Sequence, residues 1–453
     1  MKRDFSKGRI SINILHQAVP LMVAQLVQLL YNVIDRIYIG HLPQIGSAAL
    51  TGIGLVFPVT TMITAFISLY SSGGTPLFSI ARGMKEDDKA ENILGQVVTL
   101  LTLSSVILMI ICYLFRKPIL YAFGASDSSY IYADMYLQIY LVGTLFSMLT
   151  TGLNGFISAQ GYPGTGMCTV LIGAILNLLL DPLFIYGFNW GVQGAAVATV
   201  ISQLISFLWI VRFFAGKKNE YRIRKKYLIL KAGLVKNIVS LGLSGFVMQG
   251  TNCIVQVVCN KMLQMYGGDL YIGVMTVLNS VREILSIPGS TLGQGSQPVL
   301  GYNFGAKEYR RVKQAIRFTA LIAFVYMFVA WLFVIILAGP IMSVFTSDSQ
   351  MIEAGKEALK LYFFGFFFMG FQFVGQSTFT GLGCARRAIF FSLFRKVIIV
   401  VPLTIILPSL GMGITGVLVA EPVSNVIGGL ASFITMYLTL YKKLPEDGEI
   451  AHI

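Results

Sequence analysis

Charged residues are scarce in this sequence. They make up 12% of its 453 residues, against roughly 25% in soluble globular domains. Hydrophobic residues make up 55%, so a folded chain could not cover its surface with groups that favour water. The scarcity of charge excludes an ordinary soluble domain and indicates an integral membrane protein.

The sequence is also poor in residues that bind metals or act as nucleophiles. Its five cysteines stand singly without a CxxC pair, and its three histidines, His16, His41 and His452, lie far apart. These patterns predict neither a disulfide framework nor a zinc site. No GxxxxGK[ST] phosphate-binding loop occurs, which argues against an ATP-driven pump. We therefore predict a protein that is not an enzyme and has no cofactor. An integral-membrane enzyme is the less favoured alternative.

Long apolar stretches recur along the whole chain. A membrane-spanning helix needs about 20 mainly apolar residues, and the sequence offers twelve such stretches. None alternates with a period of two over the length of a strand, so the predicted fold class is all-α integral membrane rather than a β-barrel. The expected spans lie near residues 14–40, 50–80, 92–115, 131–159, 165–187, 192–214, 236–265, 272–302, 315–338, 358–383, 390–410 and 414–441.

The net charge of +14 could indicate nucleic-acid binding, but the positions of the basic residues indicate membrane topology instead. Most of the 34 Lys and Arg residues lie in the two terminal segments and in alternate connections, around 82–89, 212–236, 307–317 and 386–396. The connections near 41–48, 187–191 and 411–413 contain none. This positive-inside pattern predicts cytoplasmic N- and C-termini and no nucleic-acid partner. The polar N-terminal segment leads into a full-length span, so we do not expect a cleaved signal peptide.

The sequence contains an internal repeat. A single shift of 222 residues, without a gap, aligns a series of Gly, Pro and charged residues in the two halves, which indicates a duplication. The aligned pairs include Pro76 and Pro298, Gly83 and Gly305, Lys85 and Lys307, Gly161 and Gly383, Gly191 and Gly413, and Gly194 and Gly416.

The repeat predicts three parts. These are an N-terminal lobe over residues 1–215, a basic cytoplasmic linker over 216–234 and a C-terminal lobe over 235–453. Because each lobe has six spans, an even number, both lobes begin on the same side of the membrane and form a parallel, pseudo-symmetric repeat. Transporters that alternate access by movement of two lobes are built in this way, although a duplication could also serve stability alone.

Four acidic residues lie inside the predicted spans: Asp35, Asp181, Glu283 and Glu421. A charge at the bilayer centre costs about 2.5–3.5 kcal/mol on insertion scales, so these residues are expected to face a cavity or a partner. Asn177 and Asp181 are four residues apart and therefore lie on the same face of a helix.

This helix face has the chemistry of a cation site. The amide oxygen of Asn177, the carboxylate of Asp181 and the hydroxyl of Thr199 are oxygen ligands of the kind that a hard cation such as Na⁺ prefers. Two carboxyls close together also disfavour double ionisation, which would make one of them a carrier of H⁺. The sequence leaves both possibilities open, together with a role limited to bonding the helices to each other.

Three motifs resemble those of the multidrug and toxic compound extrusion (MATE) family of secondary transporters. Pro20 is followed fifteen residues later by Asp35. The run NLLLDPLFI covers residues 177–185, and the run GVQGAAVAT covers residues 191–199. With these motifs in this order inside a duplicated chain of twelve spans, the sequence resembles the family over nearly its whole length.

The resemblance implies an antiporter of the bacterial plasma (inner) membrane, with two six-helix lobes. Such a protein exports cationic or amphipathic small molecules in exchange for Na⁺ or H⁺, with lipid as its other partner, and we expect a monomer. A bend of the first helix at Pro20 is also implied. By motif match, the implied cation site comprises Asp35, Asn177, Asp181 and Thr199, with Asn154 as a neighbour.

The sequence departs from some branches of the family in its second half. Those branches carry an acidic pair on the seventh helix and an aspartate on the tenth. Here the seventh helix offers Gln256 and Asn260 instead, and the tenth has no acid in its apolar part. This departure favours a resemblance to DinF-type members.

The substrate cavity is expected to include Glu421, Gln256 and Glu283. Glu421 occupies the position equivalent to Thr199 under the 222-residue shift, and we expect it to contact a cationic substrate. Glu283 could instead belong to a structural network with the neighbouring Arg282.

A flippase for a lipid-linked precursor is the alternative transport function, because related exporters share the paired-lobe plan. Such flippases often carry a more basic cavity. Only Arg36 and Arg282 are predicted to be arginines embedded in the membrane, and this low number favours drug export.

Overall fold

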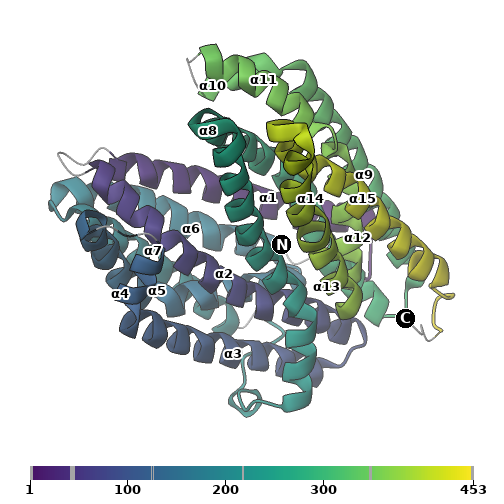
Figure 1. Ribbon diagram of the computed structural model, residues 1–453. Coiled ribbons are helices and arrows are strands. Elements are labelled where there is room, and N and C mark those ends of the chain that lie inside the picture. The colour runs from purple at the N-terminus through teal and green to yellow at the C-terminus, as the bar shows by residue number, and fades with distance from the viewer. Residues whose placement is uncertain are drawn as a thin grey trace. The chain divides into compact units, whose positions relative to one another are not determined.

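The regular structure of this protein is helical. The computed structural model describes residues 4–40, 46–123, 125, 127–216, 219–345 and 349–449, and the regular elements in these residues are all helices (Figure 1). The predicted all-α fold class is therefore confirmed.

The first half of the chain forms six long helices. Proline residues lie inside the first two of them, at position 20 of the first and positions 58 and 76 of the second. Membrane helices tolerate such prolines because neighbouring groups satisfy the freed carbonyl groups. The elements are α1 (Ile10–Gly40), α2 (Gly46–Gly83), α3 (Asp87–Leu114), the short α4 (Arg116–Ala122), α5 (Asp127–Ala159), α6 (Pro163–Pro182), the π-helical turn η1 (Leu183–Gly187) and α7 (Gly191–Ala215).

The second half repeats this order with more interruptions. A short helical turn, η2 (Lys225–Tyr227), lies in the linker before it. The elements of the second half are α8 (Ala232–Gly305), α9 (Tyr309–Ile336), α10 (Ala338–Phe345), α11 (Ser349–Phe363), η3 (Phe366–Phe368), α12 (Met369–Gly381), α13 (Ala385–Leu393), η4 (Phe394–Val400), α14 (Val401–Leu407), η5 (Pro408–Met412), α15 (Gly413–Thr439) and η6 (Tyr441–Lys443).

Two helical runs of the second half are too long for one crossing of a hydrocarbon core about 30 Å thick. Helix α8 has 74 residues, and Gly268, with φ 62° and ψ −164°, divides it into the spans Ala232–Gly268 and Leu270–Gly305. The run Ala385–Lys443 has 59 residues and turns at Gly411 and Gly413, whose φ angles are 93° and 53°.

One further span is bent. The helices Ser349–Phe363 and Phe366–Gly381 meet at an angle of 41° and are together long and apolar enough for one crossing. With these divisions, the described residues form twelve transmembrane helices in two six-helix halves, as the sequence predicts.

The duplication is visible in the backbone. Residues 222 positions apart adopt the same unusual conformations, with positive φ angles that L-residues other than Gly seldom adopt. The pairs are Lys85 (60°) and Lys307 (59°), Gly161 (92°) and Gly383 (76°), and Gly191 (52°) and Gly413 (53°). The turn between the second and third helices therefore has the same geometry in both halves.

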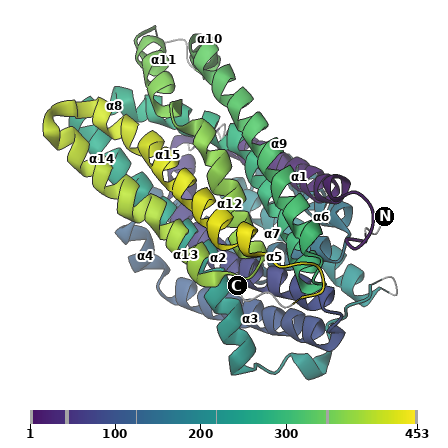
Figure 2. The same ribbon diagram turned by 90° about the vertical axis from the view of Figure 1, so that its right-hand side faces the viewer.

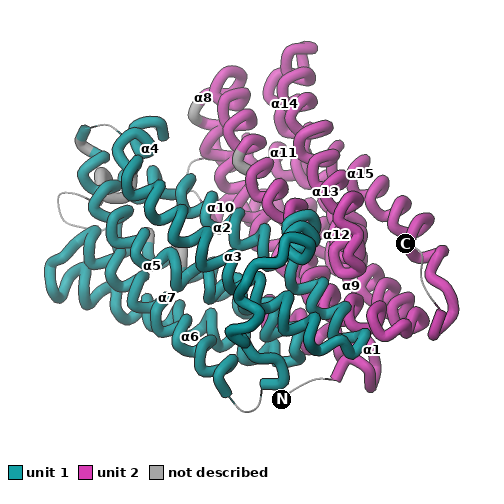
Figure 3. Tube along the Cα trace, turned by 90° about the horizontal axis from the view of Figure 1, so that it is seen from below, with its two compact units in different colours: residues 1–3, 23–242 teal, residues 4–22, 243–453 magenta. Residues whose placement is uncertain are grey.

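The described chain divides into two compact units (Figure 3). Unit 1 comprises Met1–Arg3 and Val23–Gly242, and unit 2 comprises Asp4–Met22 and Leu243–Ile453. The units differ from the predicted lobes at the first helix of each half. Residues 10–22 of α1 belong to unit 2, and residues 232–242 of α8 belong to unit 1.

Glycines make this arrangement possible within each unit. In unit 1, α2 approaches the start of α8 so closely that a Cβ on Gly73 would lie 1.9 Å from the carbonyl oxygen of Ile238. The equivalent glycine of unit 2, Gly295, would place a Cβ 2.7 Å from the backbone nitrogen of Ala18 in α1. Small residues allow membrane helices to approach in this way. The first helix of each half thus begins against the second helix of the other half.

The segment before α1 is also anchored in unit 2. Phe5 is fully buried and packs in one apolar core with Ile10 and Ile14. Its carbonyl oxygen accepts hydrogen bonds from Arg311 Nη2 at 2.9 Å and from Asn303 Nδ2 at 3.4 Å. These contacts fix the segment before α1 to the end of α8 and the start of α9.

The packing inside each unit positions the polar residues considered below. In unit 1, α6 and α7 pack on each other and on α5. In unit 2, α15 packs along η4 and α14 and against α11 and α12, as Figure 2 shows for α14 and α15. The faces that α7 and α15 turn to these neighbours hold Thr199 and Glu421, which are both buried.

Candidate functional site

A buried polar cluster lies in unit 1 at the C-terminal end of α6. The side-chain nitrogen of Asn177, Nδ2, donates hydrogen bonds to Asp181 Oδ1 and to Thr199 Oγ1, both at 3.3 Å. All three residues are between 1% and 4% exposed. Asn177 and Asp181 stand one helical turn apart, as their spacing predicts, and Pro182 ends the helix directly after them.

Asp35 brings a second carboxyl to this cluster. It lies in the part of α1 that belongs to unit 1, and its carboxyl is within hydrogen-bonding reach of the carboxyl of Asp181. Two carboxylates in a buried site repel each other strongly when both are ionised. A shared proton or a bound cation would relieve this repulsion.

The oxygen atoms of the cluster fit a hard cation. The amide oxygen of Asn177, Oδ1, is buried and has no hydrogen-bond partner among the described residues. A buried acceptor without a donor is costly unless something else satisfies it. Together with the Asp181 carboxylate and the Thr199 hydroxyl, it provides the type of ligand set that Na⁺ shares with Ca²⁺.

Three tyrosines that sequence analysis did not assign line the cluster. Tyr31 lies one turn before Asp35 on α1, and the rings of Tyr136 and Tyr140 on α5 stack at 5.8 Å with an interplanar angle of 17°. The hydroxyls of Tyr31 and Tyr136 lie within hydrogen-bonding reach of Thr199. The i, i+4 spacing of Tyr31 and Asp35, and that of Tyr136 and Tyr140, was the signal available in the sequence.

Asn154 lies away from this cluster. Its Nδ2 donates to the carbonyl oxygen of Gly166 at 3.2 Å. Gly166 precedes Asn177 by eleven residues on α6, about 16 Å along the axis at 1.5 Å per residue. The expectation that Asn154 neighbours the cation site is wrong, because a motif match does not give the register of α5 against α6.

The three residues expected in the substrate cavity do not share one environment. Glu421 is 5% exposed, whereas Gln256 and Glu283 are exposed on α8. Gln256 Nε2 donates to Asn260 Oδ1 at 3.1 Å, one turn further along the same helix. Glu283 therefore does not join Glu421 in a common buried site.

Glu421 is surrounded by basic side chains. Its Oε1 lies 3.1 Å from Arg282 Nη1, 3.3 Å from Arg395 Nη1 and 2.8 Å from Lys396 Nζ. Arg282, which sequence analysis placed beside Glu283, thus pairs with Glu421. A cationic substrate would be repelled at this point, which corrects the expectation that Glu421 contacts such a substrate.

Arg395 and Lys396 also correct the predicted topology. The sequence places them in the basic connection 386–396, but their side chains are only 13% and 4% exposed on η4. The number of embedded basic residues is therefore larger than expected. The side chain of Arg36 lies outside the described residues.

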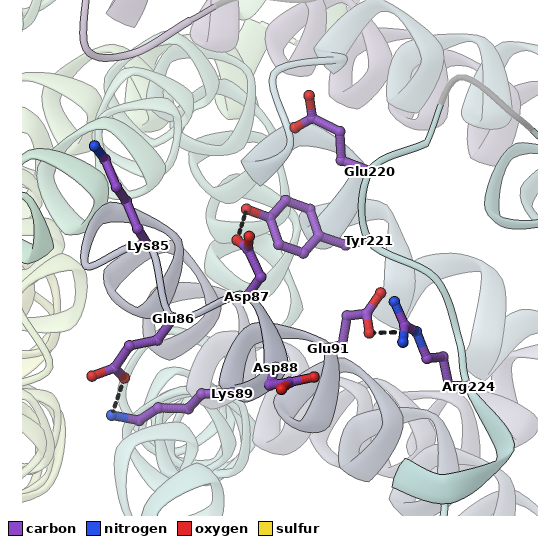
Figure 4. Close-up of a pocket in the computed structure, with 9 residues that line it drawn as sticks. All are labelled: Lys85, Glu86, Asp87, Asp88, Lys89, Glu91, Glu220, Tyr221 and Arg224. Carbon is purple, nitrogen blue, oxygen red and sulfur yellow. Dashed lines mark hydrogen bonds and ion pairs between the residues drawn. The ribbon is translucent and has the colours of Figure 1, made fainter.

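The linker between the halves docks on unit 1. A cavity of about 760 Å³ lies where the linker meets the turn between α2 and α3, and charged residues line most of it (Figure 4). Tyr221 Oη donates to Asp87 Oδ1 at 2.8 Å, and Arg224 pairs with Glu91 at 2.7 Å. Burial raises the pKa of the Tyr221 phenol, and its bond to Asp87 acts in the same direction. These pairs of side chains across the cavity join the linker to α3.

Gln96 provides a test of this docking. Its Nε2 donates to the carbonyl oxygens of Tyr227 and Ile229 at 3.0 and 2.8 Å, and its Oε1 accepts from the backbone nitrogen of Lys231 at 2.8 Å. Gln96→Leu leaves these backbone groups without their partner, at a cost of about 1–3 kcal/mol for each that stays buried. We expect a clearly lower temperature of thermal unfolding in detergent, whereas Asn260→Leu, at an exposed position, should change it little. Equal unfolding temperatures would show that the linker contributes nothing to stability.

Twelve transmembrane helices in two repeated halves, with a buried carboxyl pair in the first unit, define a multi-pass membrane transporter. The model of the MatE family matches residues 20–183 and again residues 245–406, once in each half. The chain therefore belongs to the MatE family, which confirms the resemblance seen in its motifs.

Relatives and solved structures agree with this assignment. The chain is 26% identical over 448 residues to the multidrug export protein MepA of Staphylococcus haemolyticus, covering 98% of this chain and 96% of that protein. It is 25% identical over 450 residues to MepA of Staphylococcus aureus, covering 98% of both chains. A solved outward-facing MATE family transporter of the MOP superfamily superimposes with a TM-score of 0.90 at 22% identity over 97% of each chain, and so has the same fold.

Proposed function

We propose that this MatE transporter is a secondary active antiporter that exports cationic or amphipathic small molecules by alternating access, in exchange for Na⁺ or H⁺. The family and the relatives named as multidrug export proteins make the chain a multidrug efflux transporter. The observation that carries the antiport mechanism is the buried cluster of Asp35, Asn177, Asp181 and Thr199, whose paired carboxyls need a proton or a cation.

Helix α1 provides the mechanical link in this proposal. Asp35 lies in its unit 1 part, while its residues 10–22 belong to unit 2. Pro20 stands two residues before this change, inside the helix, where the missing N–H weakens the backbone ladder. A cation bound at Asp35 and Asp181 would bend or shift α1 at Pro20 and change the affinity for the substrate. Such coupling requires that the cation prefer one of the two conformations.

The remaining features of the proposal follow from charge distribution and family. We place the transporter in the bacterial plasma (inner) membrane with both termini in the cytoplasm, because the basic residues lie in the terminal segments and alternate connections. We propose a monomer of the DinF-like branch, with a small-molecule substrate and lipid as partners and without nucleic-acid binding. The relatives are transporters, and we propose that the chain has no enzymatic activity.

Transport by the purified protein in liposomes tests the function directly. A Na⁺ gradient and a pH gradient are imposed one at a time, and the accumulation of a fluorescent lipophilic cation is recorded. We expect one of the two gradients to stimulate transport at least about tenfold, the change that 1.4 kcal/mol of coupling free energy produces. Collapsing that gradient with an ionophore should remove the stimulation. Transport that is indifferent to both gradients would exclude the antiporter.

A further inference from the structure

A cluster of basic residues in unit 2 takes no part in the proposed cation site. Arg282 from α8 and Arg395 and Lys396 from η4 converge on one atom, Oε1 of Glu421 on α15, at 3.1, 3.3 and 2.8 Å. The side chain of Glu421 is 7% exposed. Three basic groups thus surround a single buried carboxylate inside a transmembrane unit.

The charges of this cluster do not balance. Guanidinium groups stay protonated in proteins. The two arginines and Lys396 therefore place three basic groups against two carboxylates, that of Glu421 and that of Glu283, which acts on Arg282 from the next position of α8. Charged residues inside membrane proteins pair with each other or face a polar cavity or a ligand. A network that served only to bond helices would be expected to balance its charges, because an unpaired buried charge is strongly destabilising. The excess of positive charge therefore points to an anionic ligand.

The arginines keep donors available for such a ligand. Arg282 donates through Nη1 to Glu421, and Arg395 uses its own Nη1 for both Glu421 and Asn425. Within the described residues, the Nη2 atoms of both guanidinium groups make no hydrogen bond. Side-chain exposure rises from 4% at Lys396 to 13% at Arg395 and 27% at Arg282, so the arginines form the accessible side. The guanidinium fork matches carboxylate and phosphate oxygens, with two donors to two oxygens.

The cluster occupies a position that the repeat relates to the cation site. Several of its residues correspond, under the 222-residue shift, to residues that line the carboxyl cluster of unit 1. The pairs are Glu421 and Thr199, Tyr362 and Tyr140, and Asn425 and Gln203, whose side chain lies within hydrogen-bonding reach of Tyr140. The guanidinium carbon of Arg282 lies 6.0 Å from the ring centroid of Tyr362. The duplication has thus produced an acidic site in one unit and a basic site at the equivalent place in the other.

We propose that this basic site binds a carboxylate or phosphate group of the transported amphiphile. The proposal rests on the proposed export function and narrows the substrates to compounds that carry an oxyanion. A substrate that also carries a positive charge is then a zwitterion. Arg282 and Arg395 donate to the oxyanion. Lys396 and Asn425 are positioning residues, because Lys396 holds Glu421 and Asn425 holds Arg395.

A matched pair of dyes tests this site by binding. The probes are a zwitterionic rhodamine with a free carboxylate and the methyl ester of the same dye, which is only cationic, and fluorescence anisotropy reports their binding to the purified full-length protein. We expect the carboxylate dye to bind at least about tenfold more tightly than the ester. Arg282→Gln should lower this affinity ratio at least about fivefold. Arg116→Gln removes an arginine of similar exposure that pairs with Asp134 at 2.8 Å in unit 1, and it should leave the ratio unchanged.

A second variant covers the case in which Arg282→Gln does not fold. Glu421→Gln removes the carboxylate that competes for the arginine donors, so the carboxylate dye should bind several-fold more tightly to it. A purely structural network would not produce this gain. Equal affinity of wild-type protein for the two dyes, or a ratio unchanged by Glu421→Gln, would overturn the proposal.

Two further measurements complete the test. The first distinguishes a lipid oxyanion from a substrate oxyanion, and the second distinguishes failure of the oxyanion site from failure of the proposed export function. In nanodiscs, phosphatidylglycerol that displaces the carboxylate dye from wild-type protein but not from Arg282→Gln would identify a lipid phosphate as the ligand and overturn the substrate assignment. If the lipid displaces the dye from neither protein, the substrate assignment is supported. Gradient-driven transport of the ester dye tests the antiporter itself. If gradients drive transport of neither the ester dye nor the carboxylate dye, the proposed function is rejected, whereas transport of both dyes without a carboxylate preference rejects only the oxyanion site.

Discussion

Asp181→Asn should reduce gradient-driven transport in liposomes by at least about tenfold. Asparagine has nearly the same size as aspartate, so the substitution keeps the packing of α6 while it removes one of the two carboxyls that share the proton or cation. A coupling ion drives transport only through its different affinities for the two conformations, and a loss of 1.4 kcal/mol in that difference is a factor of ten. The initial rate of dye accumulation under the effective gradient measures the change.

The controls distinguish a loss of coupling from a loss of fold. Asp127→Asn replaces an exposed aspartate at the start of α5 and should transport at the wild-type rate. Exchange of labelled for unlabelled substrate without a gradient should persist in Asp181→Asn. Undiminished gradient-driven transport by both Asp181→Asn and Asp35→Asn would remove the carboxyl pair from the mechanism.

The hydroxyl of Thr199 separates the two possible ions. A Na⁺ site loses a ligand in Thr199→Val and keeps it in Thr199→Ser, because valine matches the shape of threonine without its oxygen. If Na⁺ is the coupling ion, Thr199→Val should raise the Na⁺ concentration for half-maximal transport several-fold while Thr199→Ser should not. A proton carried by Asp35 and Asp181 has no such requirement, and both variants should then keep their dependence on the pH gradient.

The sequence predicted the polar cluster of unit 1 only where local geometry determines which residues lie together. Asn177 and Asp181 share a face because a helix places residues four positions apart together, and no tertiary information is needed. Asp35 joined them through the motif resemblance, because nothing in the periodicity of α1 states which helix it will meet. Tyr136 and Tyr140 went unassigned for the same reason, since their approach to Thr199 depends on how α5 packs against α7.

The basic site of unit 2 shows a different limit of prediction from the sequence. A count of Lys and Arg by region assigned Arg395 and Lys396 to a cytoplasmic connection, because basic residues near the end of a span usually lie at the interface. In the structure, the π-helical segment η4 carries both side chains against α15, where Glu421 attracts them. Composition cannot distinguish a basic residue at the surface from one that pairs within the fold.

The division into units could not be predicted from the repeat. The 222-residue shift identifies equivalent residues, and it correctly gives the same turn at Lys85 and Lys307. It does not state whether the first helix of a half packs on its own half or on the other. That choice depends on the close contact between backbones at Gly73 and Gly295, which is invisible until the helices are placed.

Gly242→Ala should destabilise the protein by at least about 3 kcal/mol, at the upper end of the usual cost of overpacking. Gly242 lies on α8 where this helix meets α2 inside unit 1, and a Cβ there would lie 1.6 Å from the carbonyl oxygen of Leu69. A backbone oxygen cannot turn aside as a flexible side chain can, so the two helices must separate. Thermal unfolding in detergent should show a large fall in the unfolding temperature.

Gly250→Ala is the matched control, eight residues further along α8. A Cβ at Gly250 has no atom within 4 Å, and alanine is favoured over glycine in a helix by up to about 1 kcal/mol. This variant should therefore be as stable as the wild type or slightly more stable. If Gly242→Ala behaves in the same way, the close approach of α8 and α2 does not exist in the protein.

The partner glycine makes the argument specific to this contact. Gly73 on α2 faces the same crossing, where its Cβ would lie 1.9 Å from the carbonyl oxygen of Ile238. Gly73→Ala should also destabilise the protein. The double variant should cost clearly less than the sum of the two single changes, because residues in one contact are not independent, and helices already separated by the first methyl group leave room for the second. Additive effects would instead place the two glycines in separate contacts, and α8 would then have no common crossing with α2 to hold its first residues in unit 1.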